Sequence, residues 1–162
     1  MTSGRRTAEG ERDVSNIDHV LDAAAGITGA LAVALVDRTS GMTLGSRGGG
    51  RVVDLDVAAS GNSDVVATKI DVVERLGIDE EIEDILITLD TQYHLIRLIH
   101  GIPGESLFLY LVLDRTRATL ATARHELRLI EQQLFLSRPS AVVVTDAPTP
   151  PGAVHYYGSD DA

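Results

Sequence analysis

The sequence has no cysteine and no tryptophan, and aromatic residues make up only 4% of its 162 residues. Without cysteine the chain has no disulfides, no thiolate metal ligands and no cysteine nucleophile. So few aromatic residues provide no stacking platform for single-stranded nucleic acid. Apolar runs such as residues 30–36 are far too short to span a bilayer, and no apolar stretch follows the basic residues near the start. We therefore expect a cytoplasmic protein without direct membrane insertion.

Basic residues are also scarce, since 14 Lys and Arg face 24 Asp and Glu, a formal net charge of −10. This balance disfavours a nucleic-acid partner, because affinity for phosphate backbones comes mostly from Lys and Arg. The acidity is concentrated in residues 51–90, which hold eleven acidic and three basic residues, including the acidic run 79–84. One interpretation is a solvated edge that discourages strand pairing. The other is a surface that attracts a basic partner, whose association should slow as salt rises.

The length predicts one domain. Residues 1–14 show no apolar periodicity and are expected to form a disordered lead-in. Residues 137–162 contain four of the five prolines and are expected to form a flexible tail, in which 142–145 and 155–158 are candidate docking motifs. The folded domain is therefore predicted to span residues 15–136.

The hydrophobic pattern within this domain predicts the element order α-β-β-α-β-β-β-α. A helical stripe of apolar residues starts after Ser15, which serves as a cap, and stops at Gly26. The other helices are predicted at 54–76 and 120–134, and the strands at 30–36, 42–46, 82–89, 93–100 and 107–113.

The pattern of the strands predicts their order in the sheet. Strands 30–36 and 107–113 are apolar on both faces, so we place them centrally with helices above and below. Short turns force antiparallel hairpins, and the order 2-1-5-4-3 needs no crossing connection. The prediction is an α/β three-layer sandwich with a five-stranded antiparallel sheet. Strand 82–89 would then be an unprotected edge, which predicts dimerisation or a partner there.

No motif in the sequence carries recognisable catalytic chemistry. There is no P-loop, no dinucleotide fingerprint and no nucleophile elbow. His94 and His100 fall on one strand face about 20 Å apart, too far to share a metal. A triad of Ser40, His94 and Asp37 can be imagined, but nothing singles it out. We predict a protein that is not an enzyme and uses no metal or cofactor.

Several short stretches carry a resemblance to a known family. They are 26–29 (Gly-Ile-Thr-Gly), Ala58-Ala59, 113–115 (Leu-Asp-Arg) and 118–124, with Asp37 and Gly41 in the first hairpin. Through them, residues 15–136 resemble the roadblock family (dynein light chain roadblock type, profilin-like in fold), especially its bacterial members. The chain departs from the family pattern at Thr119, where Asn is common, and at Ala121, where Gly is common. The residues taken as the fold motif are Gly29, Asp37, Gly41, Asp114, Leu120 and Arg124.

The resemblance implies a homodimer in which the long helices, 54–76, pair and the third strands, 82–89, meet edge to edge. It also implies a Ras-like small GTPase as partner, with a sensor histidine kinase encoded nearby in the clusters called conservons. Recruitment to the membrane would then be peripheral, through partners. The interface residues expected from this picture are Val65, Val66, Lys69, Ile70, Val73, Ile82, Glu83 and Ile85.

Whether such a protein accelerates GTP hydrolysis is a separate question, and no arginine stands in a context that singles it out as a finger. A rival hypothesis is a signalling scaffold that docks a sensor kinase or a polar assembly by edge-strand addition, without a GTPase. A third, a small-molecule sensor resembling PAS-type domains, requires a roomy cavity, which the dense aliphatic pattern of the central strands argues against.

Overall fold

The computed structural model describes residues 7–102 and 106–136, with side chains placed for 16–102 and 106–134. The expected flexible tail, 137–162, lies outside the described residues. The helices are α1 (Thr7–Ala25), α2 (Leu55–Arg75) and α3 (Leu120–Leu136), and the strands are β1 (Ala30–Asp37), β2 (Met42–Gly48), β3 (Asp84–Thr88), β4 (Gln92–Ile99) and β5 (Leu107–Asp114). The predicted element order is confirmed.

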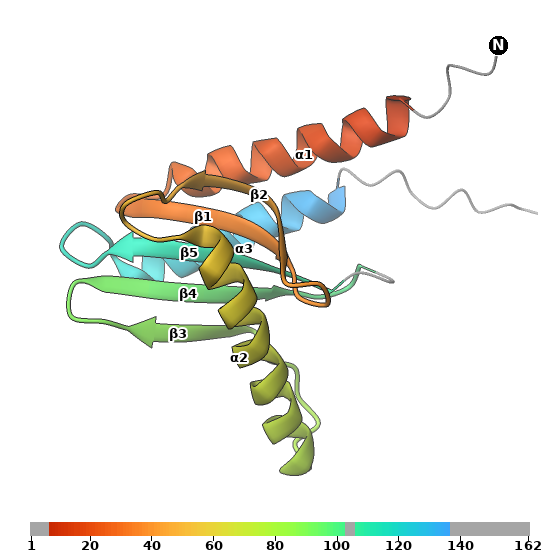
Figure 1. The fold of residues 1–162 in the computed structure, drawn as a ribbon, viewed down its shortest axis with the longest axis vertical. Helices are drawn as coiled ribbons and strands as arrows, with labels where there is room; N and C mark the ends of the chain where they lie inside the picture. Colours follow the sequence, from red (N-terminus) through yellow and green to blue (C-terminus); the bar gives the residue numbers. More distant parts are fainter. Residues whose placement is uncertain (1–6, 103–105, 137–162) are drawn as a thin grey trace, which may run out of the picture.

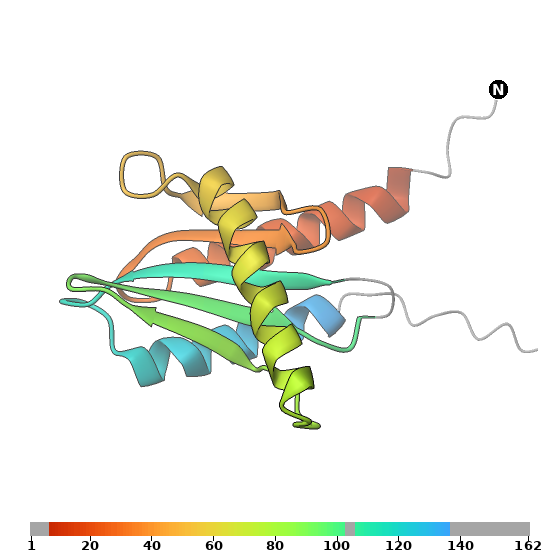
Figure 2. The same cartoon turned by 60° about the horizontal axis from the view of Figure 1, so that its bottom comes forward.

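The five strands form one antiparallel sheet in the order β2-β1-β5-β4-β3, as predicted. Helices α1 and α3 lie side by side on one face of the sheet and α2 crosses the other (Figures 1 and 2). Every residue of β5 from Leu107 to Leu113 is buried, because this central strand has helices over both faces. A strand apolar on both parities therefore marks the middle of the sandwich.

Each face of the sheet has its own hydrophobic core. Under α1 and α3 the sheet contributes alternate residues such as Val33, Leu95 and Leu111. Under α2 it contributes the residues of the other parity, such as Ala34 and Ile96. The period-two alternation of the sequence thus assigns each strand residue to one of the two cores.

Helix α1 begins at Thr7, which corrects the expected start after Ser15 and the expected disorder of residues 7–14. The physical reason is that this stretch lacks proline and contains good helix formers such as Ala, Arg and Glu. Adding turns to an existing helix also avoids the costly nucleation step. Lack of an apolar stripe therefore did not prevent helix formation there.

Helix α2 has well-defined ends. Asp54 is the N-cap, and its side chain accepts hydrogen bonds from the backbone N–H groups of Asp56 and Val57. Gly77 ends the helix with φ of 68°, and its N–H and that of Ile78 close a Schellman motif on the last turn. The predicted stop at Gly77 is confirmed. Within the described residues, no helix is both long and apolar enough to cross a membrane.

Candidate dimerisation and partner-binding surface

Helix α2 carries a second apolar stripe that faces solvent. Besides its buried face it exposes Val57, Val65, Val72 and Leu76, of which Val57 is 70% exposed and Leu76 66%. At 3.6 residues per turn these four lie within about 100° of one another around the helix axis. A helix that is apolar on two faces needs a second packing partner. We call these four residues the outer stripe.

The C-terminal half of α2 extends beyond the sheet. In both views the helix crosses β3 and continues past it (Figures 1 and 2). Strand β3 pairs only with β4 among the described residues, so its other edge is open. Ile85 and Ile87 of this strand are half-buried on the α2 face. The overhanging helix and the open edge thus form one continuous surface.

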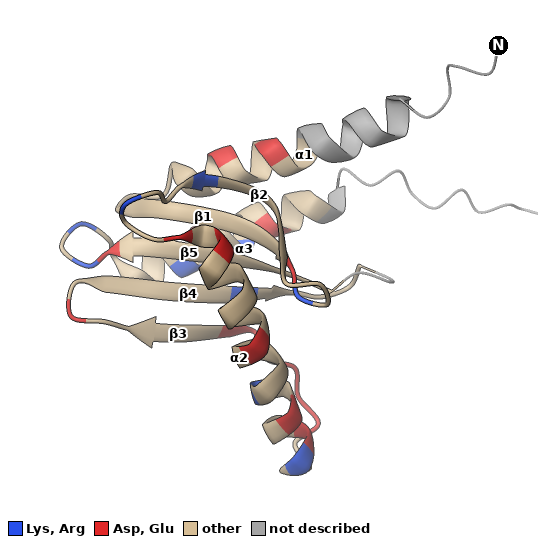
Figure 3. Cartoon of the chain, viewed as in Figure 1, with Lys and Arg blue, Asp and Glu red and all other residues tan. Residues whose placement is uncertain are grey.

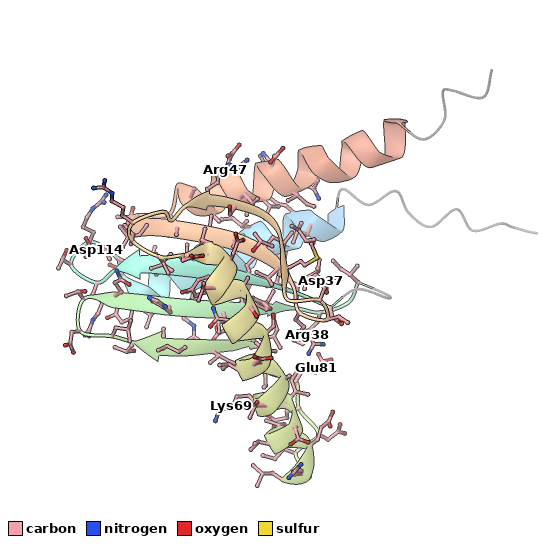
Figure 4. The ribbon with its side chains drawn as sticks, in the orientation of Figure 1. Asp37, Arg38, Arg47, Lys69, Glu81 and Asp114 are labelled. Atoms are coloured by element: carbon pink, nitrogen blue, oxygen red, sulfur yellow. The ribbon has the colours of Figure 1, made fainter. Side chains whose placement is uncertain are left out.

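The structure places most of the predicted interface residues on this surface. Val65 and Lys69 are exposed on α2, with Lys69 pointing away from the sheet (Figure 4). Val66 is different, since its side chain is fully buried against the sheet and is unavailable to another molecule. The remaining predicted residues, Ile70, Val73, Ile82 and Ile85, are half-buried and Glu83 is exposed.

A single arginine is buried beneath the β3 edge, on the face covered by α3. The Arg97 Nε donates a hydrogen bond to Glu131 Oε2 of α3 at 2.6 Å. Its Nη1 lies 3.4 Å from a carboxylate oxygen of Glu83 and 3.6 Å from one of Asp84. Burial lowers the pKa of the Arg97 guanidinium, but the surrounding carboxylates outweigh burial and raise it. Arg97 is therefore a charged group at the centre of an ion-pair network.

Two further arginines reach this network from α3. Arg124 holds Asp84 with both Nε and Nη2, at 3.0 and 2.8 Å. Arg128 Nη2 donates to Glu83 Oε1 at 3.0 Å. The charges of Arg97 and then Arg128 hold the pKa of Glu83 below its usual value. We call Glu83, Asp84, Arg97, Arg124, Arg128 and Glu131 the edge network.

The edge network divides the acidic run 79–84. The side chain of Asp84 is only 7% exposed and fully paired, so a solvated edge is the wrong description of this residue. Asp79, Glu80 and Glu81 remain exposed in the linker between α2 and β3 (Figure 3). Sequence reasoning missed the network, although one signal was present. Arg97 shares a strand face with the apolar Leu95 and Ile99, which is typical of a buried, paired charge.

A chain of polar side chains crosses the core beneath α2. The Tyr110 hydroxyl donates to His94 Nδ1 at 2.7 Å, and His94 Nε2 donates to Gln92 Oε1 at 2.9 Å. This arrangement is that of a neutral imidazole. Burial lowers the pKa of His94 and raises that of Tyr110, which the neighbouring Asn62 opposes.

The imagined triad is not assembled. His94 bonds to Tyr110 and Gln92. Asp37 Oδ1 accepts from the backbone N–H of Thr39, and Ser40 Oγ from that of Met42. Each of the three side chains therefore bonds to its own neighbours. The bonds of Asp37 and Ser40 stabilise the β1–β2 turn.

The first residues of the fold motif shape turns. Gly29 has φ of 86°, and a Cβ there would lie 2.8 Å from the Cβ of Ala118, so the loop before β1 packs tightly on the loop before α3. Gly41 has φ of 72° and donates its N–H to the Asp37 carbonyl at 2.8 Å, closing the β1–β2 hairpin.

The remaining motif residues organise the start of α3. Asp114 Oδ1 accepts from both the backbone N–H and the hydroxyl of Thr116, and these bonds lower the pKa of Asp114. Leu120 is half-buried at the first position of α3, and Arg124 belongs to the edge network. The fold-motif residues therefore stabilise turns and the start of α3, and they do not form a catalytic arrangement.

Comparisons with known proteins agree with this architecture. No protein-family model and no curated protein matches the chain. Among solved structures, a roadblock/LC7 domain from Streptomyces avermitilis is 13% identical with a TM-score of 0.62, covering 74% of this chain and 94% of that one. Myxococcus xanthus MglB is 18% identical with a TM-score of 0.62, covering 85% and 98%. The gliding protein MglB from Thermus thermophilus is 20% identical with a TM-score of 0.64, covering 77% and 90%. The fold that the sequence resemblance predicts is thus confirmed: the described residues, 7–102 and 106–136, adopt the roadblock/LC7 fold.

Proposed function

We propose that the chain is a bacterial roadblock protein, a non-enzymatic homodimeric regulator or adaptor that binds a Ras-like small GTPase. The observation that carries the proposal is the outer stripe of α2 beside the open edge of β3. The folded part is residues 15–136 with the added α1 turns, and the protein acts in the cytoplasm, reaching membranes only through partners.

A homodimer would cover two features that are exposed in the monomer: the outer stripe of α2 and the open edge of β3. If two β3 edges pair antiparallel, each sheet continues beneath the overhanging α2 of the other protomer. Val65 and Val72 of the outer stripe then meet the second α2, and Ile85 lies beneath the overhanging helix of the partner. Apolar burial would provide about 25 cal/mol for each Å² covered.

The GTPase partner is supported by the fold, which MglB from two bacteria shares. It is also supported by the exposed carboxylates along α2 and its linker, which favour a basic docking surface on the partner (Figure 3). With no catalytic constellation among the described side chains, we propose an adaptor whose effect on hydrolysis comes from repositioning the GTPase's own residues.

The dimer is tested by analytical ultracentrifugation of Val65→Asp at micromolar concentration. A charge in the outer stripe should shift the mass from a dimer to the 17.3 kDa monomer. Ala67→Asp is the matched control, because Ala67 is exposed on the same helix away from the stripe, and should remain dimeric. A wild-type monomer, or equal behaviour of the two variants, would refute the interface.

GTPase binding is tested by calorimetric titration with a purified Ras-like small GTPase from the same organism, loaded with GDP or with a non-hydrolysable GTP analogue. We expect binding to at least one form that the Val65→Asp variant weakens, and a hydrolysis assay on the same pair separates an adaptor from an activator. Absence of binding in both nucleotide states would exclude the GTPase hypothesis.

The second candidate function is a scaffold that docks a sensor kinase or a polar assembly by adding a strand to β3. It is favoured by the unpaired edge alone. In that case a wild-type monomer would accept an extended peptide along β3, whereas in the dimer this edge is occupied.

A further inference from the structure

A groove of about 390 Å³ lies on one side of α2, between its C-terminal half, the α2–β3 linker and the ends of β1 and β4. Its floor is aliphatic, made by Ile70 and Val73 of α2, Ile78 and Ile82 of the linker, and Leu98 of β4. This volume is at the lower end of the range for ligand pockets. The floor can therefore hold a small number of apolar side chains.

The rim of the groove is strongly acidic. Glu74, Asp79 and Glu80 line it, and their carboxylates have no ion-pair or hydrogen-bond partner among the described residues. Glu81 has only His100, whose Nδ1 lies 3.7 Å from its Oε2. This contrasts with the adjacent edge network, where every carboxylate faces an arginine. The rim thus offers unneutralised negative charge directly above an apolar floor.

One cation also lines the groove. Arg38, at the start of the β1–β2 turn, lies on the same side of α2 as Glu81 (Figure 4). Its backbone N–H bonds to the carbonyl of Ser106 at 2.9 Å, which anchors the backbone of Arg38. Four carboxylates against a single guanidinium exclude an anion as the main ligand. A purely apolar ligand would desolvate the carboxylates without replacing their lost water.

We propose that this groove binds a short extended segment of a partner protein in which Lys or Arg alternates with aliphatic residues. The aliphatic side chains fill the floor, and the basic side chains reach the carboxylates of Glu74, Asp79 and Glu80. The methylene stems of the basic side chains cover the border of the apolar floor, while their charged ends remain partly hydrated. The site does not require the partner to be a GTPase, so it goes beyond the function proposed above.

The test is fluorescence anisotropy with the full-length chain and a fluorescein-labelled peptide, Leu-Arg-Ile-Arg-Leu flanked by Gly-Ser, at physiological ionic strength. Two double variants remove the same charge. Glu74→Gln with Glu80→Gln changes the groove, whereas Asp64→Asn with Asp90→Asn changes exposed carboxylates outside it. A second peptide keeps both arginines and replaces the aliphatic residues with serine.

We expect the first peptide to bind the wild-type chain, the groove variant to bind it on the order of tenfold more weakly, and the control variant to bind as wild type. The serine peptide should bind on the order of tenfold more weakly as well, because it cannot fill the floor. Equal weakening in the two double variants would mean diffuse charge attraction and would overturn the site, as would absence of binding to the wild-type chain. Because no GTPase is present, the outcome is independent of the test of the proposed function.

Discussion

At the scale of residues, the clearest feature is Arg97, a guanidinium inside a strand whose neighbours on the same face are aliphatic. Burying a charge is costly unless it is paired and hydrogen-bonded, and here Glu131 provides the shortest contact, 2.6 Å. The pairing joins α3 to β4 and, through Asp84, to the edge strand. One side chain thus connects the core to the candidate interface.

Replacing Glu131 by Gln should destabilise the chain by about 3 kcal/mol, because it leaves a buried guanidinium short of one charge. The matched control is Asp71→Asn, which removes the carboxylate of the exposed Asp71–Arg75 pair and should cost less than about 1 kcal/mol. Urea unfolding of both variants measures the difference. Similar losses in the two would contradict a special role for the buried pair.

His94 should make stability depend on pH. Burial lowers its pKa in the folded state, so on acidification the unfolded chain takes up this proton first and unfolding is favoured. The loss begins as the pH falls through the ordinary value of 6.5 and levels off below the lowered pKa of the folded state.

The measurement is chemical denaturation across this range for the wild type and His94→Gln, which should lose the slope. His125→Gln, at an exposed position of α3, is the control and should keep it. An unchanged slope in His94→Gln would show that the half-buried imidazole of His94 is not the source of the pH dependence.

At the scale of elements, glycines have opposite roles according to their surroundings. Gly29, with positive φ and Ala118 against it, allows the loop before β1 to pack on the loop before α3. Gly61 lies in α2 with no atom within 4 Å of the position of a Cβ. The first position requires glycine, whereas the second only weakens a helix.

Gly29→Ala should therefore destabilise the chain by more than about 1 kcal/mol, through both backbone strain and the 2.8 Å approach to Ala118. Gly61→Ala should stabilise α2 by about 1 kcal/mol within the protomer. Thermal unfolding of the two variants should move in opposite directions. A stabilised Gly29→Ala would show that the loop can relax at little cost.

The position or the end of an element was predictable where its hydrophobic or glycine pattern allowed one interpretation. The two-sided apolar strands Ala30–Asp37 and Leu107–Asp114 could only be central, and the Gly77 stop left no choice for the end of α2. The start of α1 was not predictable from periodicity, since the sequence of residues 7–14 has no apolar period. The edge network was not predictable either, because ion pairs such as Arg124–Asp84 join residues 40 positions apart.

At the scale of the whole molecule, the interface was predictable only in part for a related reason. Val65 and Val66 are adjacent in sequence and equally apolar, yet one is on the outer stripe and the other is fully buried. Which side faces the sheet depends on how α2 is rotated over the strands, and that rotation follows from packing of both cores. Tertiary packing also decides which acidic residues are neutralised. The edge network neutralises Glu83 and Asp84, whereas the carboxylates of the groove rim keep their charge.

This charge distribution predicts the salt dependence of the dimer proposed above. Two β3 edges whose carboxylates are neutralised by arginines repel each other little. The dissociation constant of the dimer should therefore change by less than about threefold between low and high salt. The double variant Arg124→Gln with Arg128→Gln leaves the negative charges of Glu83 and Asp84 less neutralised. The variant dimer should therefore be weaker than the wild type at low salt, and its affinity should recover as salt screens the repulsion. Sedimentation across a salt series tests both, and a strongly salt-dependent wild-type dimer would contradict the compensation.

The strand order has a consequence for how the chain reaches its native state. Strand β1 pairs with β5, and the partners Ala30 and Leu113 are separated by most of the folded sequence. Two-stranded hairpins alone are marginal in water, so neither the β1–β2 nor the β3–β4 hairpin is stable before β5 joins them. Closing such a long loop makes folding slow and all-or-none, with β5 as the last part to complete the sheet during synthesis. Backbone amides of β1 and β5 should accordingly be the slowest to exchange with solvent deuterium, because only global unfolding exposes them.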